Sequence, residues 1–117
     1  MSEPIYTLKA EFFKTLGHPA RIRILELLAE GEHSVTELMP KLGLESSHLS
    51  QQLAVLRRAG LVAARKQGNN VIYSMTSKDM AELLQVARKV LTELLTDQMG
   101  LLKDLQDSSR VSAQGDH

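Results

Sequence analysis

The chain has no cysteine among its 117 residues. This absence excludes disulfides, thiolate metal sites and cysteine nucleophiles. No apolar run approaches the roughly 18 residues that a membrane-spanning helix needs, and the opening MSEPIYTLK lacks the apolar core of a signal peptide. We therefore expect a cytoplasmic protein, folded as one domain that buries roughly 65% of the surface exposed by the unfolded chain.

The motifs of common enzyme classes are also missing. The sequence holds no glycine-rich phosphate loop, no HExxH and no local nucleophile–base pattern. Its four histidines do not share a helical face, which disfavours a histidine-built metal site: His18, His33, His48 and His117. We expect no enzymatic activity, no catalytic residue, no metal and no cofactor.

The net charge is zero, which is unusual for a protein that binds nucleic acid. Residues 45–76, however, hold four basic side chains against the single acid Glu45: Arg57, Arg58, Arg65 and Lys66. The flanking segments 1–44 and 77–117 are slightly acidic. Because a local field matters more than the total charge within about one Debye length, residues 45–76 are the segment in which to seek a DNA-binding surface.

Two helices are predicted at the start of the chain. Residues 5–16 place apolar side chains at helical spacing (Ile5, Leu8, Phe12 and Leu16), and Gly17 ends that helix. Pro19 suits the first turn of a second helix, which Gly31 terminates. Its buried stripe is predicted to be Ile22, Leu25 and Leu28.

A short third helix and a tight turn follow. Ser34-Val-Thr-Glu37 is a capping-box pattern, and the helix should run to about Leu42. Pro40 lies inside it and removes one backbone hydrogen bond. Leu42-Gly43-Leu44 is then a turn of the kind that helix-turn-helix units need.

The fourth helix is predicted to start near Ser46 and to stop before Gly60. Its leucines face inward at i, i+4 and i+7: Leu49, Leu53 and Leu56. At about 100° per residue, the opposite face carries Ser47, Gln51, Ala54 and Arg58, flanked by His48, Ser50 and Arg57. Gln52 lies nearer the buried side, which favours a structural role or a contact with the DNA backbone.

Residues 61–76 change to the alternating period of a β-hairpin, with Gly68-Asn69-Asn70 at its tip. A helix that fits a DNA groove, joined to a basic ribbon that reaches the adjacent backbone, is typical of a recognition helix followed by a wing. The fold class is then mainly α with a small β-hairpin, in the order ααααββα.

The last helix is predicted to span residues 77–107, with Gly100 as a possible earlier end. Its seam steps by four and three like a heptad repeat and is apolar except at Gln98: Met80, Leu84, Ala87, Leu91, Leu94, Gln98, Leu101 and Leu105. At 1.5 Å per residue such a helix is roughly 45 Å long. Because one small core cannot cover it, we expect a second chain to cover the rest; packing on its own domain alone is the alternative. Residues 1–107 form the predicted domain, and residues 108–117 a disordered tail.

Several side chains have the chemistry to contact duplex DNA. Gln51 suits a bidentate contact to adenine in the major groove, and arginine or lysine suits phosphate. The tip amides fit a minor groove or the backbone, and the start of the third helix offers hydroxyls and N–H groups to phosphate. The predicted DNA-binding residues are Ser34, Thr36, Ser46, Ser47, His48, Ser50, Gln51, Arg57, Arg58, Arg65, Lys66, Gln67, Asn69 and Asn70.

Three stretches, in this order and spacing, resemble the ArsR/SmtB family of bacterial repressors: FKTLGHPARIRILELLAEG, VTELMPKLGLESSHLSQQLAVLRRAGLV and RKQGNNVIYSM. The resemblance implies a winged helix-turn-helix fold and a homodimer through the first and last helices. It also implies binding to a palindromic operator that ends when an effector binds. The implied interface residues are Ile5, Leu8, Phe12, Met80, Leu84, Ala87, Leu91 and Leu94.

The sequence also departs from the family pattern. Metal-sensing members carry Cys-Val-Cys where this chain has Ser34, Val35 and Thr36, so no thiolate is available. The zinc site between the last helices of other members falls on Ser77, Asp79, Val90 and Glu93, which include no histidine. The recognition helix reads Ser50-Gln51-Gln52-Leu53 where many members have Ser-x-His-Leu, so the usual base preference does not transfer. A different class also stays open, a helical dimerisation or protein-interaction module without DNA binding.

Overall fold

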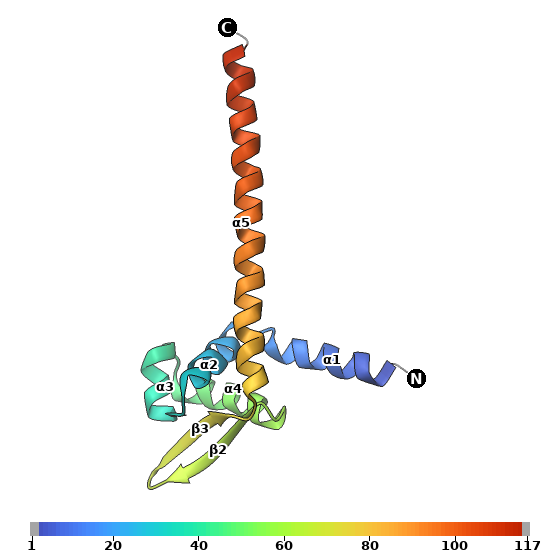
Figure 1. Cartoon of the computed structure of the whole chain (residues 1–117). Helices are drawn as coiled ribbons and strands as arrows, with labels where there is room; N and C mark the ends of the chain where they lie inside the picture. The colour runs from blue at the N-terminus through green and yellow to red at the C-terminus, as the bar shows by residue number, and fades with distance from the viewer. Residues whose placement is uncertain (1–2, 116–117) are drawn as a thin grey trace. The chain divides into compact units, whose positions relative to one another are not determined.

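The computed structural model describes the backbone of residues 3–115 and the side chains of residues 4–107 (Figure 1). The elements follow in the order α1 (Glu3–Leu16), α2 (Pro19–Glu30), β1 (His33–Ser34), α3 (Val35–Leu42), α4 (Ser46–Arg58), β2 (Val62–Gln67), β3 (Asn70–Met75) and α5 (Lys78–Gly115). The chain divides into two compact units, Met1–Glu82 and Leu83–His117. Apart from β1 and the length of α5, the elements lie where the sequence predicted them.

Helix α2 is the centre of the first unit, because it contacts α1, α3, α4 and β3. The core around it is almost entirely aliphatic: Ile24, Leu25, Leu28, Leu38, Leu42, Leu49, Leu53, Leu56 and Val62. Full burial of one such side chain contributes about 1.5–3 kcal/mol. Leu25 and Leu28 confirm the predicted stripe, whereas Ile22 is only half-buried and Ile24, outside that stripe, is completely buried.

The starts of α2 and α3 are both capped by side chains. The imidazole Nδ1 of His18 accepts a hydrogen bond from the backbone N–H of Ala20 at 3.1 Å, directly before Pro19 at the first helical position. The hydroxyl of Ser34 accepts from the backbone N–H of Glu37 at 3.1 Å, and the Ser34 N–H donates to the Glu37 carboxylate at 2.9 Å. The predicted capping box is therefore confirmed.

The sheet contains one strand that the sequence did not predict. Its order is β1-β3-β2, and all its pairs are antiparallel. In β1, His33 pairs with Tyr73 and Ser34 with Ile72. The correct order is therefore ααβααββα. Two residues are too short to show an alternating pattern, so β1 is recognisable only through its partner strand.

The hairpin of β2 and β3 turns through a two-residue loop, Gly68 and Asn69, between the paired residues Gln67 and Asn70. Gly68 has a φ of 64°, and no residue other than glycine has a positive φ among the described residues. Positive φ at the first loop position alone is the pattern of a type II′ turn. The tip is thus one residue shorter than predicted, because Asn70 already belongs to β3.

Helix α5 continues past Gly100 and ends at Gly115, eight residues beyond the predicted end. No proline interrupts residues 108–115, so helical backbone can continue there. The predicted division into a domain of residues 1–107 and a tail stays a prediction, and residues 116–117 lie outside the described residues. Within residues 3–115, no helix is both long and apolar enough to span a bilayer.

We expect Ser34→Ala to lower the free energy of unfolding by about 1 kcal/mol, because it removes the N-cap acceptor of α3. Thr36→Ala, on the exposed side of the same turn, should change it by less than about 0.5 kcal/mol. Chemical denaturation of both variants tests this. Equal losses in the two variants would contradict a specific cap.

The same cap should make stability depend on pH. Hydrogen bonding with Ser34, first through its backbone N–H and then through its side chain, lowers the pKa of the Glu37 carboxyl below its ordinary value of 4.5. The stabilisation by the ionised Glu37 carboxylate is therefore present above pH 4.5 and is lost as the pH falls through the lower pKa of the folded state. The difference in Tm between the wild type and Glu37→Gln should shrink over that acidic range.

Candidate nucleic-acid interface

Helix α4 divides cleanly into a buried and an exposed face. Leu49, Leu53 and Leu56 are at most 1% exposed, which confirms the predicted inward stripe. The residues predicted on the outer side are all exposed: Ser46, Ser47, His48, Ser50, Gln51, Ala54, Arg57 and Arg58. This outer surface is polar, small at Ala54 and basic at its end.

The first turn of α4 is open to a ligand. Its N-cap residue, Glu45, makes no side-chain cap hydrogen bond. The first N–H groups of a helix have no partner within the helix and carry a partial positive charge. Ser46 and Ser47 add exposed hydroxyls at this end. Together these groups can bind an anionic oxygen, such as one on a phosphate.

Gln52 is the one polar residue on the inner face of α4. It is 8% exposed, and its side-chain oxygen accepts a 2.8 Å hydrogen bond from Nε of Arg21 in α2. Of the two roles predicted for Gln52, this contact is the structural one. Arg23, also in α2, donates to the carbonyls of Leu42 and Lys41 at the end of α3. Two guanidinium groups of α2 thus hold the two helices of the helix-turn-helix.

The joint between α4 and the hairpin is tied by four hydrogen bonds. The N–H groups of Gly60 and Leu61 donate to the carbonyls of Arg57 and Leu56, at 2.9 and 3.0 Å. Gly60 has a φ of 77°, so this is a Schellman motif. Beyond the hairpin, the hydroxyl of Thr76 donates to the Gly60 carbonyl at 2.7 Å. The backbone N–H of Thr76 donates to the Leu61 carbonyl at 3.2 Å. Both ends of the hairpin are therefore anchored at the end of α4.

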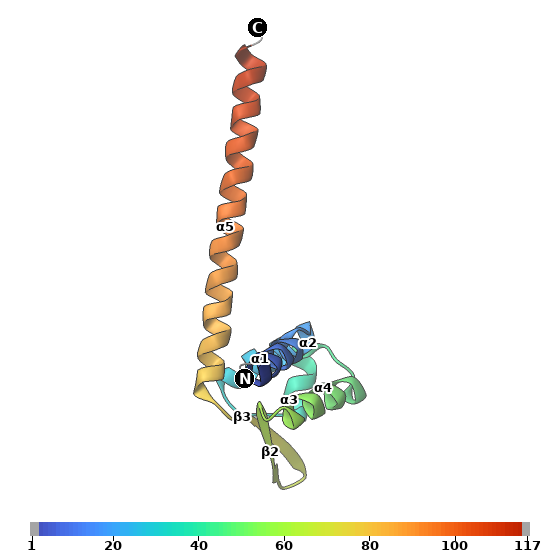
Figure 2. The ribbon, with the colours of Figure 1, turned by 90° about the vertical axis from the view of Figure 1, so that its right-hand side faces the viewer.

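β3 contacts α2 and α3, and the outer end of the hairpin extends beyond these helices in both views (Figures 1 and 2). Lys66, Gln67, Asn69 and Asn70 are exposed along its outer half. Arg65 is exposed too, but its guanidinium forms an ion pair with Glu32 and donates to the Gln67 side-chain oxygen at 2.8 Å. The structure therefore gathers all the basic candidates at the surface, with Arg65 already paired.

The two candidates at the start of α3 differ. Thr36 is exposed, whereas Ser34 is 5% exposed and its hydroxyl serves the capping box. Because Ser34 is buried in this capping role, Thr36 is the more accessible of the two side chains.

The described residues hold no group of three or more side chains placed to bind a metal ion. The imidazole rings of His18 and His48 lie edge-to-face with centroids 6.4 Å apart. Nδ1 of His18 accepts the cap of α2, so in the neutral ring Nε2 carries the proton. A metal ion at Nε2 would have to displace that proton, so capping and metal binding compete.

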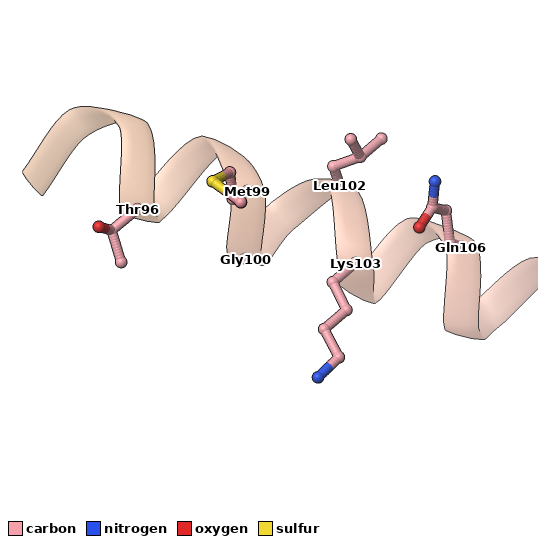
Figure 3. Close-up of a pocket in the computed structure, with 6 residues that line it drawn as sticks. All are labelled: Thr96, Met99, Gly100, Leu102, Lys103 and Gln106. Atoms are coloured by element: carbon pink, nitrogen blue, oxygen red, sulfur yellow. The ribbon is translucent and has the colours of Figure 1, made fainter. Parts of the chain in front are cut away.

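A surface groove with a volume of about 570 Å³ lies in the second unit. Figure 3 shows its six residues, which all belong to α5, with Leu102 and Lys103 pointing to opposite sides of the helix. A groove lined by one helix does not enclose a small molecule, because a binding site buries most of its ligand.

The predicted interface residues occupy different environments. Ile5, Leu8, Leu91 and Leu94 are 50–64% exposed, and Ala87 is exposed as well. Phe12 is half-buried and packs edge-to-face on Phe13 at 5.3 Å. Met80 and Leu84 are buried at the start of α5. Large apolar side chains thus remain exposed on α1 and on most of α5.

Three residues that position this surface carry no local sequence signal and were not predicted: Arg21, Arg23 and Glu32. Their partners lie 31, 18 or 19, and 33 residues away along the chain. No local pattern signals pairs at such distances. The only sequence signal for one of these contacts was Gln52, a polar residue at a position that helical periodicity predicts to be buried.

Comparison with known proteins identifies the family. A family model described as "Bacterial regulatory protein, arsR family" matches residues 18–64. The HTH-type transcriptional regulator Rv0081 of Mycobacterium tuberculosis is 66% identical over 106 residues, which cover 90% of this chain and 93% of that protein. The chain belongs to the arsR family of bacterial regulatory proteins. The family and these relatives are transcriptional regulators rather than enzymes.

Solved structures agree with this assignment. The crystal structure of M. tuberculosis Rv0081 aligns with a TM-score of 0.78 at 67% identity, over 82% of this chain and 97% of that one. A homodimeric winged helix-turn-helix domain from Mycobacterium bovis aligns with a TM-score of 0.73 at 31% identity, over 80% and 87%. A further relative by sequence, the biofilm growth-associated repressor of Agrobacterium fabrum, is 43% identical over 65% of each chain. The predicted winged helix-turn-helix fold is therefore confirmed.

Proposed function

We propose that this arsR-family regulator is a homodimeric repressor that binds a palindromic operator and releases it when an effector binds. The observation that carries the proposal is the exposed polar face of α4, fixed beside a basic hairpin. Relatives support the finer points, since one is named a repressor and another is described as homodimeric. A regulator of this kind acts on DNA in the cytoplasm.

In this proposal α4 enters the major groove. The N-terminal turn with Ser46, Ser47 and His48 approaches first. Gln51, in the middle of the exposed face, makes a bidentate contact to adenine, and Ala54 lets the helix axis come close to the groove floor. Arg57 and Arg58, at the end of the helix, neutralise phosphates.

The hairpin supplies the second contact as a wing. Lys66 is exposed on β2 and neutralises a phosphate, and the amides of Gln67, Asn69 and Asn70 follow the backbone or the minor groove. Arg65 exchanges Glu32 for a phosphate; an exposed ion pair is worth only about 0–1 kcal/mol, so this exchange costs little.

The exposed apolar side chains of α1 and α5 form the dimer interface in this proposal. Ile5, Leu8, Leu91 and Leu94 are half exposed or more in the single chain, and burial would stabilise them by about 25 cal/mol per Å² of apolar surface. The same surface would also serve a protein-interaction module without DNA binding. Lys66 and the tip amides favour the DNA-binding protein, because such a module has no use for them.

Selection from random-sequence DNA, followed by titration at several salt concentrations, tests the proposal. We expect a two-fold symmetric consensus with half-site centres about 10 base pairs, or a multiple, apart. The logarithm of the association constant should fall by about 0.9 per phosphate contacted for each unit of log salt. A chain that enriches no sequence would instead be the interaction module.

Gln51→Ala should relax specificity more than affinity, with about 1–3 kcal/mol of discrimination lost at one base pair. Lys66→Ala should weaken binding to all sequences alike and reduce the salt slope by about 1. Lys89→Ala, an exposed lysine on α5, is the control and should change neither quantity. Equal losses on all sequences in both test variants would reject this division of roles.

Leu91→Asp should dissociate the dimer, because it places a charge among apolar side chains that the second chain would cover. Operator affinity should fall with it. Gln85→Asp, at an exposed polar position of the same helix, should leave both unchanged. Analytical ultracentrifugation and DNA titration measure the two effects; a folded monomer of Leu91→Asp with normal operator affinity would refute the link.

A further inference from the structure

One guanidinium group joins three helices of the first unit. Arg21 lies in the first turn of α2. Its Nε donates to the side-chain oxygen of Gln52 in α4 at 2.8 Å, and its Nη1 donates to the backbone carbonyl of Thr15 in α1 at 3.2 Å. Both contacts are partly buried. Arg21 therefore binds α1 and α4 at the same time.

The hydrogen bond from Arg21 to Gln52 in α4 is directional, whereas the apolar contacts of the neighbouring leucines are not. Gln52 is buried beside the stripe of Leu49, Leu53 and Leu56 on the inner face of α4. Aliphatic side chains tolerate small shifts and repacking, whereas a hydrogen bond weakens steeply when its angle departs from linear. An unpaired buried amide is also unfavourable. The Arg21–Gln52 bond thus resists rotation and sliding of α4 more than the leucines alone would.

The contact with α1 uses a group that the helix leaves free. The Thr15 carbonyl belongs to the last turn of α1, where carbonyls have no partner within the helix and a cation is favoured. The end of α1 is therefore fixed by the same guanidinium that fixes α4. In the proposed dimer, α1 belongs to the interface and α4 to the DNA-binding surface.

We propose that Arg21 and Gln52 are positioning residues for DNA binding. They set the angle between α1 and α4, and hence the separation of the two α4 helices in the dimer. That separation determines which distance between half-sites the protein accepts. This inference rests on the proposed function, since it requires a dimer that binds a two-fold symmetric site.

The test measures the dissociation constant on symmetric DNA sites whose half-site spacing changes by single base pairs. The wild type should bind its best spacing about tenfold or more tightly than spacings one base pair away, because each base pair moves a half-site along and around the duplex. Gln52→Leu should reduce this preference to about threefold or less, or move its optimum, with little change on an isolated half-site.

Two variants separate positioning from a merely structural role. Gln52→Glu keeps an acceptor for Arg21 and should retain the wild-type spacing preference. Arg23→Gln removes a similar guanidinium from the same helix, but its partners are the carbonyls of α3, so it should also retain the preference. Arg21→Lys cannot reach both partners from one ammonium group and should behave like Gln52→Leu; it also replaces that variant if Gln52→Leu does not fold.

The outcomes distinguish this inference from the function on which it rests. If the wild type prefers one spacing and Gln52→Leu and Arg21→Lys lose affinity equally at every spacing, the pair is only structural and the inference is wrong. If the wild type prefers no symmetric site at all, the proposed function fails and this inference fails with it. A flattened or shifted preference confined to Gln52→Leu and Arg21→Lys supports it.

Discussion

Burial of the inner face of α4 is the constraint on which the rest of the first unit depends. Three leucines of this helix are at most 1% exposed, and they pack into a core built around α2. Because helical periodicity is fixed, burying them leaves Ser47, Gln51 and Arg58 in solvent. The surface proposed to meet DNA is thus a direct consequence of the core.

The same periodicity explains which parts of the molecule were predictable. The capping box of Ser34 and Glu37, the glycine turn at Gly43 and the leucine stripe of α4 are all patterns of neighbouring residues. Their physics acts within one or two helical turns, so sequence spacing alone locates them. The exposed side of α4 followed in the same way.

The features that were missed depend on contacts between distant parts of the chain. β1 exists only because His33 and Ser34 pair with Tyr73 and Ile72. The Arg21–Gln52 bond and the Arg65–Glu32 ion pair cross more than 30 residues. Ser34 shows the reverse case, since the sequence suggested a DNA contact at a residue that the fold buries and that caps α3. The residue types of the site can therefore be predicted from the sequence, whereas the contacts that position them are known only from the fold.

The anchoring of the hairpin at Gly60 and Thr76 has a mechanical consequence. Six residues per strand at about 3.3 Å each make the hairpin roughly 20 Å long. A tilt of about 10° at its base would displace the tip amides by about 3 Å, the length of a whole hydrogen bond. Small distortions of the four hydrogen bonds at that base are therefore amplified along the hairpin. They decide whether the tip amides still reach their binding partner.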